Sequence, residues 1–262
     1  MKTNIRTILC LLFVALFLIL SMPLHLVLWL IGRKKPMTKY RVSYKVIRWA
    51  FRVVFGICGI RVHSFGSERI PQDTPVLFVS NHRSNLDILL IQTTAGVPVG
   101  FVAKKELGKI PLLGFWMSDI GCVFLDRMNI KSAVKSMTEG AAHIETGCSM
   151  AICPEGTRGH DADMKPFKDG SMKIATKAKI PIVPVAVIGT DDCLENNAGL
   201  KVTKGHMTVV YGEPIDLNAL DPEDKKHLGA YTQKYVKELY DSHKAEHDAL
   251  CQKQNQHKTA NE

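Results

Sequence analysis

The chain has 262 residues, of which 46% are apolar and 23% are charged, a composition that is typical of a globular protein and excludes an intrinsically disordered one. Its formal net charge of +9 arises at the N-terminus, because eleven Lys and Arg residues and no acidic residue precede Glu68. A nucleic-acid-binding protein would carry that charge on the folded domain, so this class is disfavoured.

The first long feature is an apolar run at residues 8–31, which carries no formal charge and is interrupted only by Ser21, Pro23 and His25. As a helix it would be about 36 Å long, enough to cross a bilayer. A cleaved signal peptide is a weaker interpretation, because the run is longer than a typical signal core and no A-x-A-like cleavage site follows it. A buried core helix is weaker still. The run fits either a membrane span or a re-entrant hairpin formed with residues 41–60.

Basic residues are concentrated on one side of this run. Arg33, Lys34 and Lys35 follow it at once, whereas only Lys2 and Arg6 precede it. By the positive-inside rule, the downstream domain lies on the cytoplasmic side of the cell membrane.

Residues 41–60 show helical periodicity. Arg41, Lys45, Arg48 and Arg52 recur at spacings of four, three and four, which places them on one helix face opposite aliphatic and aromatic residues. This pattern predicts a basic amphipathic helix at the membrane interface, and the alternative is an ordinary amphipathic helix packed on the domain. Residues 1–62 are therefore predicted to form an N-terminal membrane-associated segment.

From about residue 68, short apolar runs alternate with helical patterns. This alternation predicts an α/β domain over residues 63–250, with a largely parallel sheet flanked by helices, followed by a polar tail at 251–262. The predicted strands are 76–80, 99–103, 121–125, 149–153, 181–188 and 207–211. The predicted helices are 86–94, 130–145, 171–179 and 222–247.

The cysteines indicate a reducing compartment. There are seven, an odd number, and no C-x-x-C pair occurs, so neither a disulfide framework nor a zinc site is predicted. Cys153 is expected to be a buried, inert thiol at the end of an apolar strand.

The strand at 76–80 ends in the sequence NHRSNLD, which places His82 where parallel α/β sheets bind ligands. The spacing Ser84-x-x-Asp87 is that of a helix capping box, so Asp87 can be a structural carboxylate and His82 a plain loop histidine. The same spacing also allows Asp87 to orient His82 as a general base. Both interpretations are open from these residues alone.

The strand at 149–153 runs into PEGTRG, where glycines let backbone N–H groups approach a ligand and Arg158 can hold a phosphate bidentately. The alternative is a glycine-rich turn in which Glu155 and Arg158 pair with each other. Arg127 follows the strand at 121–125 and supplies a second cation. The sequence PIVPV, with two prolines in an apolar run, predicts an edge strand or an irregular pocket wall.

These four stretches together resemble the glycerolipid acyltransferase family. NHRSNLD is similar to the H-x4-D block of that family, GCVFLDR to its G-x-x-F-x-x-R block and PEGTR to its E-G-T-R block, and PIVPV resembles the fourth, proline-containing block. The blocks occur in family order over residues 81–188, and the resemblance is strongest to bacterial members that acylate 1-acyl-glycerol-3-phosphate. Cys153 stands where the family usually has an aromatic residue.

The resemblance implies transfer of a fatty acyl group from a thioester to the 2-hydroxyl of lysophosphatidic acid, giving phosphatidic acid without an acyl-enzyme. His82 is then the general base and Asp87 its orienting group. The glycerol-phosphate site is implied for Arg127, Glu155, Gly156, Thr157 and Arg158. The implied partners are a membrane lipid and either acyl-carrier protein or acyl-coenzyme A, with no metal, redox cofactor or nucleic acid.

Three alternatives remain at this point. The first is an acyltransferase of the same fold with another acceptor, such as glycerol-3-phosphate, a lyso-ornithine lipid or another lysophospholipid. The second is a non-catalytic lipid-binding or scaffold protein of the membrane. The third is a lipid hydrolase, which would be expected to carry a G-x-S-x-G nucleophile motif, and the sequence has none.

Overall fold

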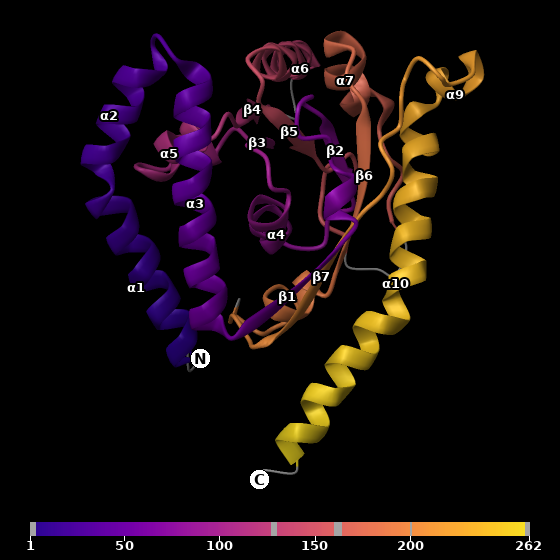
Figure 1. Cartoon of the computed structure of the whole chain (residues 1–262). Helices are drawn as coiled ribbons and strands as arrows, with labels where there is room; N and C mark the ends of the chain where they lie inside the picture. The colour runs from indigo at the N-terminus through magenta and orange to yellow at the C-terminus, as the bar shows by residue number, and fades with distance from the viewer. Residues whose placement is uncertain (1–3, 127–129, 160–163, 200, 260–262) are drawn as a thin grey trace.

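The computed structural model describes residues 4–126, 130–159, 164–199 and 201–259, and within them a seven-stranded sheet lies between two layers of helices (Figure 1). The strand order is β1-β7-β6-β2-β5-β3-β4. Neighbouring strands are parallel, except that β6 and β7 are antiparallel. The strands are β1 (Ile60–Phe65), β2 (Leu77–Ser80), β3 (Val99–Lys104), β4 (Val123–Leu125), β5 (Ser149–Ile152), β6 (Ile182–Ile188) and β7 (Gly205–Tyr211). The predicted α/β fold with a largely parallel sheet is confirmed.

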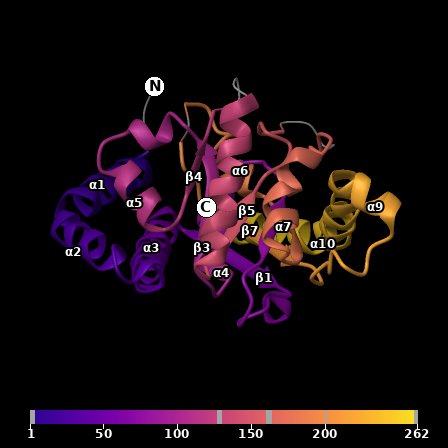
Figure 2. The ribbon, with the colours of Figure 1, turned by 90° about the horizontal axis from the view of Figure 1, so that it is seen from above.

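Alternate residues of each strand enter different cores, because side chains of a strand point to opposite faces. In β2, Phe78 joins the core under α3, α4 and α5, whereas Leu77 and Val79 join the core under α6, α7 and α10. Figures 1 and 2 show these helices on opposite faces of the sheet, with α1 and α2 outside α3. The helices are α1 (Ile5–Leu20), α2 (Met22–Gly32), α3 (Pro36–Cys58), α4 (Leu86–Thr94), α5 (Leu113–Asp119), α6 (Ile130–Glu145), α7 (Lys173–Ala178), α8 (Thr190–Cys193), α9 (Pro222–Lys226) and α10 (Leu228–Thr259), with 3-10 turns η1 (Ser67–Arg69), η2 (Leu107–Lys109) and η3 (Asp169–Met172).

The strands and helices predicted after residue 68 are observed within a few residues of their predicted bounds, and α4 and α6 match those bounds. The short helices α5 and α8 were not predicted. The predicted helix 222–247 is divided at His227 into α9 and α10, and α10 continues into the predicted tail. β1 was not predicted, because its sequence IRVHSF interrupts the apolar residues with Arg61, His63 and Ser64. Since β1 pairs with β7, the sheet extends across the predicted domain boundary at residue 62.

The apolar run at residues 8–31 forms two helices rather than one. α1 ends at Leu20 and α2 begins at Met22, with Pro23 in its first turn, where a missing N–H favours a helix start. Among the described residues, no single helix has the length and apolarity to cross a membrane, whereas α1 and α2 together do, with a bend of 51° between them.

The predicted amphipathic helix at 41–60 is observed as α3, and its apolar face is largely covered, although Trp49 is 57% exposed. Tyr44, Ile47 and Val54 are buried against the domain and against α1 and α2. On the basic face, Arg48 donates to the carbonyl of Thr93 at the end of α4 (3.0 Å). The alternative interpretation, a helix packed on the domain, therefore describes α3, and a role at the membrane interface stays a prediction.

The prediction that PIVPV marks an edge strand is wrong, because β6 lies between β7 and β2. Pro184 is tolerated there because the β6–β7 ladder is irregular at this point. Val185 pairs with Tyr211, and the next paired residues are Ile182 and Ile215. The stretch between these two pairs is one residue longer on the β7 side than on the β6 side. The proline, which has no N–H, thus lies at a bulge.

Candidate active site

The candidate site forms where three adjacent strands end. β5, β2 and β6 are parallel neighbours, so the loops that follow Ile152, Ser80 and Ile188 emerge at one edge of the sheet. Asn81 joins the loop after β2 to strand β6, because its side-chain amide donates to the carbonyl of Val187 (3.0 Å) and accepts from the N–H of the same residue (2.8 Å). The first motif is therefore held rigidly against β6.

His82 and Asp87 form the hydrogen-bonded pair that one interpretation of the motif predicts. Nδ1 of His82 lies 2.9 Å from Oδ2 of Asp87, whose side chain is fully buried, whereas 15% of the His82 side chain is exposed. The same Oδ2 accepts the backbone N–H groups of Arg83 (2.8 Å) and Ser84 (2.9 Å). Asp87 therefore caps the start of α4 and orients His82 at the same time, so the two readings of the motif are not exclusive.

A third member of this network comes from the segment after β6. The hydroxyl of Thr190 donates to Oδ1 of Asp87 over 2.6 Å, and both side chains are buried. Two carboxylates of the same segment also hold the first motif. Asp191 pairs with Arg83 through Nε (3.1 Å) and Nη2 (2.8 Å), and Glu195 accepts from the backbone N–H of Asn85 (2.9 Å).

Sequence reasoning did not find Thr190, Asp191 or Glu195 as members of the site. Their sequence, TDDCLE, resembles an ordinary helix start, since acidic residues are common there. Only its position in the sequence could have indicated Thr190 as a site residue. It lies two residues after the end of β6, at the sheet edge where β2 and β5 also end.

Glu155 joins the second motif to the first. Its buried carboxylate accepts the backbone N–H of His82 (2.7 Å) and, with its other oxygen, the backbone N–H of Lys165 (3.0 Å). The carbonyl of His82 in turn accepts from the N–H of Gly159 (2.9 Å). The alternative in which Glu155 pairs with Arg158 is not what the structure shows, since Glu155 accepts from the backbone of His82 and of Lys165.

Arg158 pairs with a different carboxylate. Its Nη1 donates to Oε1 of Glu195 (2.7 Å). The Glu195 side chain is buried, and its other oxygen, Oε2, accepts from the hydroxyl of Ser84. The Arg158 side chain is still 38% exposed, so the guanidinium lies at the surface of the site. Arg127, the other predicted cation, lies outside the described residues.

Two lysines that sequence reasoning missed lie beside the second motif. Lys165 donates to the hydroxyl of Thr157 (3.0 Å) and to the carbonyl of Arg158 (3.1 Å). Nζ of Lys168 lies 3.1 Å from the point where a Cβ on Gly156 would be, and Gly156 has a φ of +76°. A side chain at residue 156 would be strained and would displace that lysine.

Cys153 is not the buried thiol that was expected. It follows the end of β5, is partly exposed, and lies 3.4 Å from the hydroxyl of Ser80. Burial of the His82 ring disfavours its charged form, but the nearby sulfur of Cys153 and the carboxylate of Asp87, which is hydrogen-bonded to Nδ1, outweigh burial and raise the pKa of His82 to about 10.

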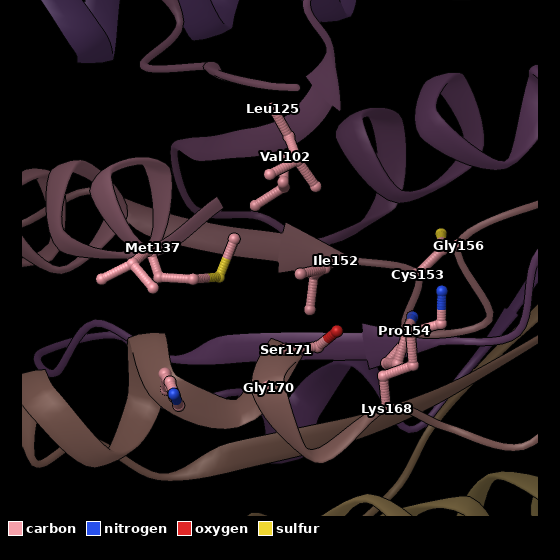
Figure 3. A pocket seen from close by; sticks show the side chains of 12 residues that line it. Val102, Leu125, Met137, Ile152, Cys153, Pro154, Gly156, Lys168, Gly170 and Ser171 are labelled. Carbon is pink, nitrogen blue, oxygen red and sulfur yellow. The ribbon is translucent and has the colours of Figure 1, made fainter. Parts of the chain in front are cut away.

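A largely apolar cavity of about 310 Å³ lies beside Cys153 and Pro154, at the end of β5 (Figure 3). Val102, Leu125, Met137 and Ile152 point into it, and Cys153, which contacts His82, lines one end. Such a cavity suits a flexible hydrocarbon chain whose reactive end reaches the imidazole. Within the ranges that the structure describes, no cluster of three or more His, Cys, Asp or Glu side chains is arranged to hold a metal ion.

Comparison with known proteins agrees with this fold and site. Residues 60–188 match the family model described as Acyltransferase. The chain is 32% identical over 225 residues to a probable 1-acyl-sn-glycerol-3-phosphate acyltransferase of Mycoplasma genitalium, covering 81% of each chain, and 30% identical over 189 residues to the 1-acyl-sn-glycerol-3-phosphate acyltransferase of Borreliella burgdorferi, covering 72% of this chain and 75% of that one.

A solved structure gives the same result. The crystal structure of the 1-acyl-sn-glycerophosphate (LPA) acyltransferase PlsC from Thermotoga maritima superposes with a TM-score of 0.76 and 28% sequence identity, covering 92% of this chain and 97% of that one. The fold and the site thus define an α/β enzyme of acyl transfer. The chain belongs to the acyltransferase family that includes these 1-acyl-sn-glycerol-3-phosphate acyltransferases.

Proposed function

We propose that this protein transfers a fatty acyl group from an acyl thioester to the 2-hydroxyl of 1-acyl-glycerol-3-phosphate, giving phosphatidic acid. The observation that carries the proposal is the His82–Asp87 pair, with a partly exposed imidazole at the sheet edge beside an apolar cavity. The names of the relatives support the choice of acceptor.

The dyad supplies general-base chemistry. Nδ1–H of His82 donates to Asp87, which leaves Nε2 to take the proton of the acceptor hydroxyl once the imidazole is neutral. The alkoxide oxygen bonds to the thioester carbonyl carbon, the carbon–sulfur bond breaks, and the donor thiolate leaves and takes up the proton held by His82. This sequence balances without an acyl-enzyme and uses neither a metal nor a redox cofactor.

The second motif supports binding of the acceptor phosphate. Arg158 belongs to this motif, and Lys165 and Lys168 bring two further cations to Thr157 and Gly156. The apolar cavity accommodates a fatty chain, and the donor is either acyl-carrier protein or acyl-coenzyme A, since both present the same thioester.

A bilayer location follows from the acceptor and from the N-terminal helices. α1 and α2 expose large apolar side chains along their outer side, including Leu11, Leu20 and Leu26, which would be unfavourable in water. Arg33, Lys34 and Lys35 at the end of α2 are exposed and would face anionic headgroups. We place the domain on the cytoplasmic side of the membrane, where acyl thioesters are available.

The deciding experiment uses the purified full chain with labelled 1-acyl-glycerol-3-phosphate and each of the two thioesters. Labelled phosphatidic acid is the expected product, and His82→Ala is expected to lower kcat by roughly 10²–10⁴-fold while lysolipid binding persists. Absence of product with both donors would reduce the protein to a lipid-binding role, and faster turnover of another acceptor would correct the substrate. An acyl-thioester trapped on Cys153 would contradict direct transfer.

A further inference from the structure

The segment between β3 and β4 exposes apolar side chains that no other part of the described chain covers. This segment, residues 105–119 and here called the α5 segment, runs from the carboxyl end of β3 through η2 and α5. Ile110 is 45% exposed and Phe115 is 48% exposed, and Pro111 between them is exposed as well. Two large apolar side chains at the surface of one short segment suggest an interaction surface.

These side chains are continuous with the apolar outer side of α1 and α2. The ring of Phe115 stacks on His25 of α2, with centroids 4.9 Å apart, and the next residue, Trp116, donates its indole N–H to Ser21 (2.9 Å). Ser21 is the break between the two helices, and the neighbouring Leu20 is 74% exposed. Figures 1 and 2 both place α5 beside these helices.

Polar contacts fix the α5 segment to the helices as one unit. The buried carboxylate of Asp119 accepts from Nδ1 of His25 (2.5 Å) and lies 3.6 Å from Nζ of Lys39. Ser21 and His25, which interrupt the apolar run, therefore face the α5 segment. The outward side of the unit is left apolar, with Phe115 and Leu20 on it.

Charge favours a lipid surface over another protein copy as the occupant. Lys109 directly precedes Ile110 and is exposed, and Arg33, Lys34 and Lys35 are exposed at the end of α2. An isologous dimer through this face would bring these like charges together. An anionic leaflet instead offers hydrocarbon to the apolar side chains and phosphates to the cations.

We propose that the α5 segment is a third membrane-inserting element, which enters the same anionic leaflet as α1 and α2 through Ile110 and Phe115. The proposal rests on the proposed function in one respect, because it assumes that α1 and α2 lie in a bilayer. It adds that the chain leaving β3 at the edge of the active site is itself in contact with lipid. An acceptor lipid would then pass along this segment to reach His82.

Photocrosslinking tests the proposal without requiring turnover. Phe115 is replaced by p-azidophenylalanine in the full chain, which is then bound to vesicles of phosphatidylcholine and labelled phosphatidylglycerol and irradiated. Leu20 on α1 receives the same replacement as a positive control, and Tyr235 of α10, an exposed aromatic on the other side of the sheet, serves as the negative control. Label is expected at residues 20 and 115 and not at residue 235.

Each result has a separate meaning. Lipid at residue 20 but not at residue 115 overturns the inference and leaves the proposed membrane location intact. A protein–protein adduct at residue 115 overturns it in favour of a second copy. Lipid at residue 115 in a protein that makes no phosphatidic acid supports the inference while the proposed function fails.

A quantitative variant supports the crosslinking. Ile110→Ser with Phe115→Ser is expected to weaken partitioning onto the same vesicles by roughly tenfold, because two half-exposed apolar side chains lose their burial in lipid. Activity on acceptor dispersed in neutral detergent is expected to stay near that of the unmodified chain. The control is Tyr235→Ser, and equal partitioning of the two variants would contradict the proposal.

Discussion

At the scale of single residues, the hydroxyl of Thr190 determines how Asp87 can hold His82. Its 2.6 Å hydrogen bond occupies the Asp87 oxygen that does not contact the imidazole. We expect Thr190→Val to lower kcat by about tenfold, with little change in KM, and to cost about 0.5–1.5 kcal/mol of stability. Thr190→Ser is expected to restore kcat. Steady-state kinetics and thermal unfolding of both variants check this, and lower stability with unchanged kcat would make the bond purely structural.

The pH dependence of the reaction is set by the charges around His82. Because its pKa is raised to about 10, the neutral base becomes more abundant as the pH rises, so kcat/KM is expected to increase from pH 7 towards pH 10. Cys153→Ala removes one of the two groups that raise this pKa. The rise in activity should therefore begin at lower pH in this variant.

A thiol elsewhere in the protein provides the matched control for this experiment. Cys122 is buried, and burial raises the pKa of its thiol to about 12, so it has no charge to act on His82 near neutral pH. The pH profile of Cys122→Ala should follow that of the unmodified protein. If Cys153→Ala also has an unchanged profile, the sulfur does not influence the imidazole and Asp87 alone accounts for its basicity.

Arg158 is expected to act on the acceptor rather than on the donor. Its guanidinium is positioned by Glu195 through one terminal nitrogen and remains partly exposed. Arg158→Ala should raise KM for the phosphate-bearing acceptor more than KM for the thioester, and Arg158→Lys should restore little, because lysine cannot make the planar bidentate contact. An equal loss of activity with an acceptor that lacks phosphate would remove the anchoring role.

At the scale of elements, the sequence predicted the sheet edge well because strand and helix periods are local properties. The carboxyl ends of parallel strands lie at the same edge of a sheet, so the segments after β2 and β5 were expected at one edge. This placed His82 and Glu155 in the same site. The partner of Arg158 could not be predicted. Glu195 is far from it in the chain, and their meeting depends on how the segment after β6 folds back over α4.

The break between α1 and α2 shows the same limit. Ser21, Pro23 and His25 were visible as interruptions of an apolar run, but their contacts with Trp116 and Asp119 are tertiary. The types of these residues did not show whether they are polar residues within a membrane span or polar residues that contact the α/β domain. Which face of a helix is exposed also depends on tertiary packing. In α3, for example, Ile47, Ala50 and Val54 are buried.

The docking of α2 can be tested through Asp119. Asp119→Ala leaves His25 and Lys39 without their common carboxylate in a largely buried site, at a cost of about 1–3 kcal/mol. We expect faster amide hydrogen exchange in α2 and α5, measured by mass spectrometry in detergent, with exchange in β2 and β6 unchanged. Asp119→Asn keeps an acceptor for His25 and should show a smaller effect. Uniformly faster exchange through the sheet would mean that Asp119 supports the whole fold instead.

At the scale of the whole molecule, positive charge and exposed apolar surface gather on one side. α1, α2 and the basic residues 33–35 lie on one side of the sheet, and α7, α9 and α10 lie on the other (Figures 1 and 2). If the first side is the bilayer face, replacing Arg33, Lys34 and Lys35 by Gln should weaken docking on anionic lipid by roughly 1 kcal/mol for each charge. The α/β domain and the dyad should be unaffected, since these side chains are remote from both.

The measurement is the ratio of activity on anionic vesicles to activity on acceptor dispersed in neutral detergent, followed across salt concentration. We expect a lower ratio for this triple variant, and the ratio for the unmodified protein should fall towards it as salt rises, because exposed charges are screened within about 8–10 Å at physiological ionic strength. Lys179, Lys225 and Lys234 are exposed on the far side and provide a matched triple replacement of equal charge. If that control lowers the ratio as much, net charge governs vesicle binding and no particular face is turned towards the membrane. If only the replacement of residues 33–35 lowers the ratio, the side of the protein that carries α1 and α2 faces the membrane. The acceptor then reaches the carboxyl ends of the strands from the leaflet in which it lies.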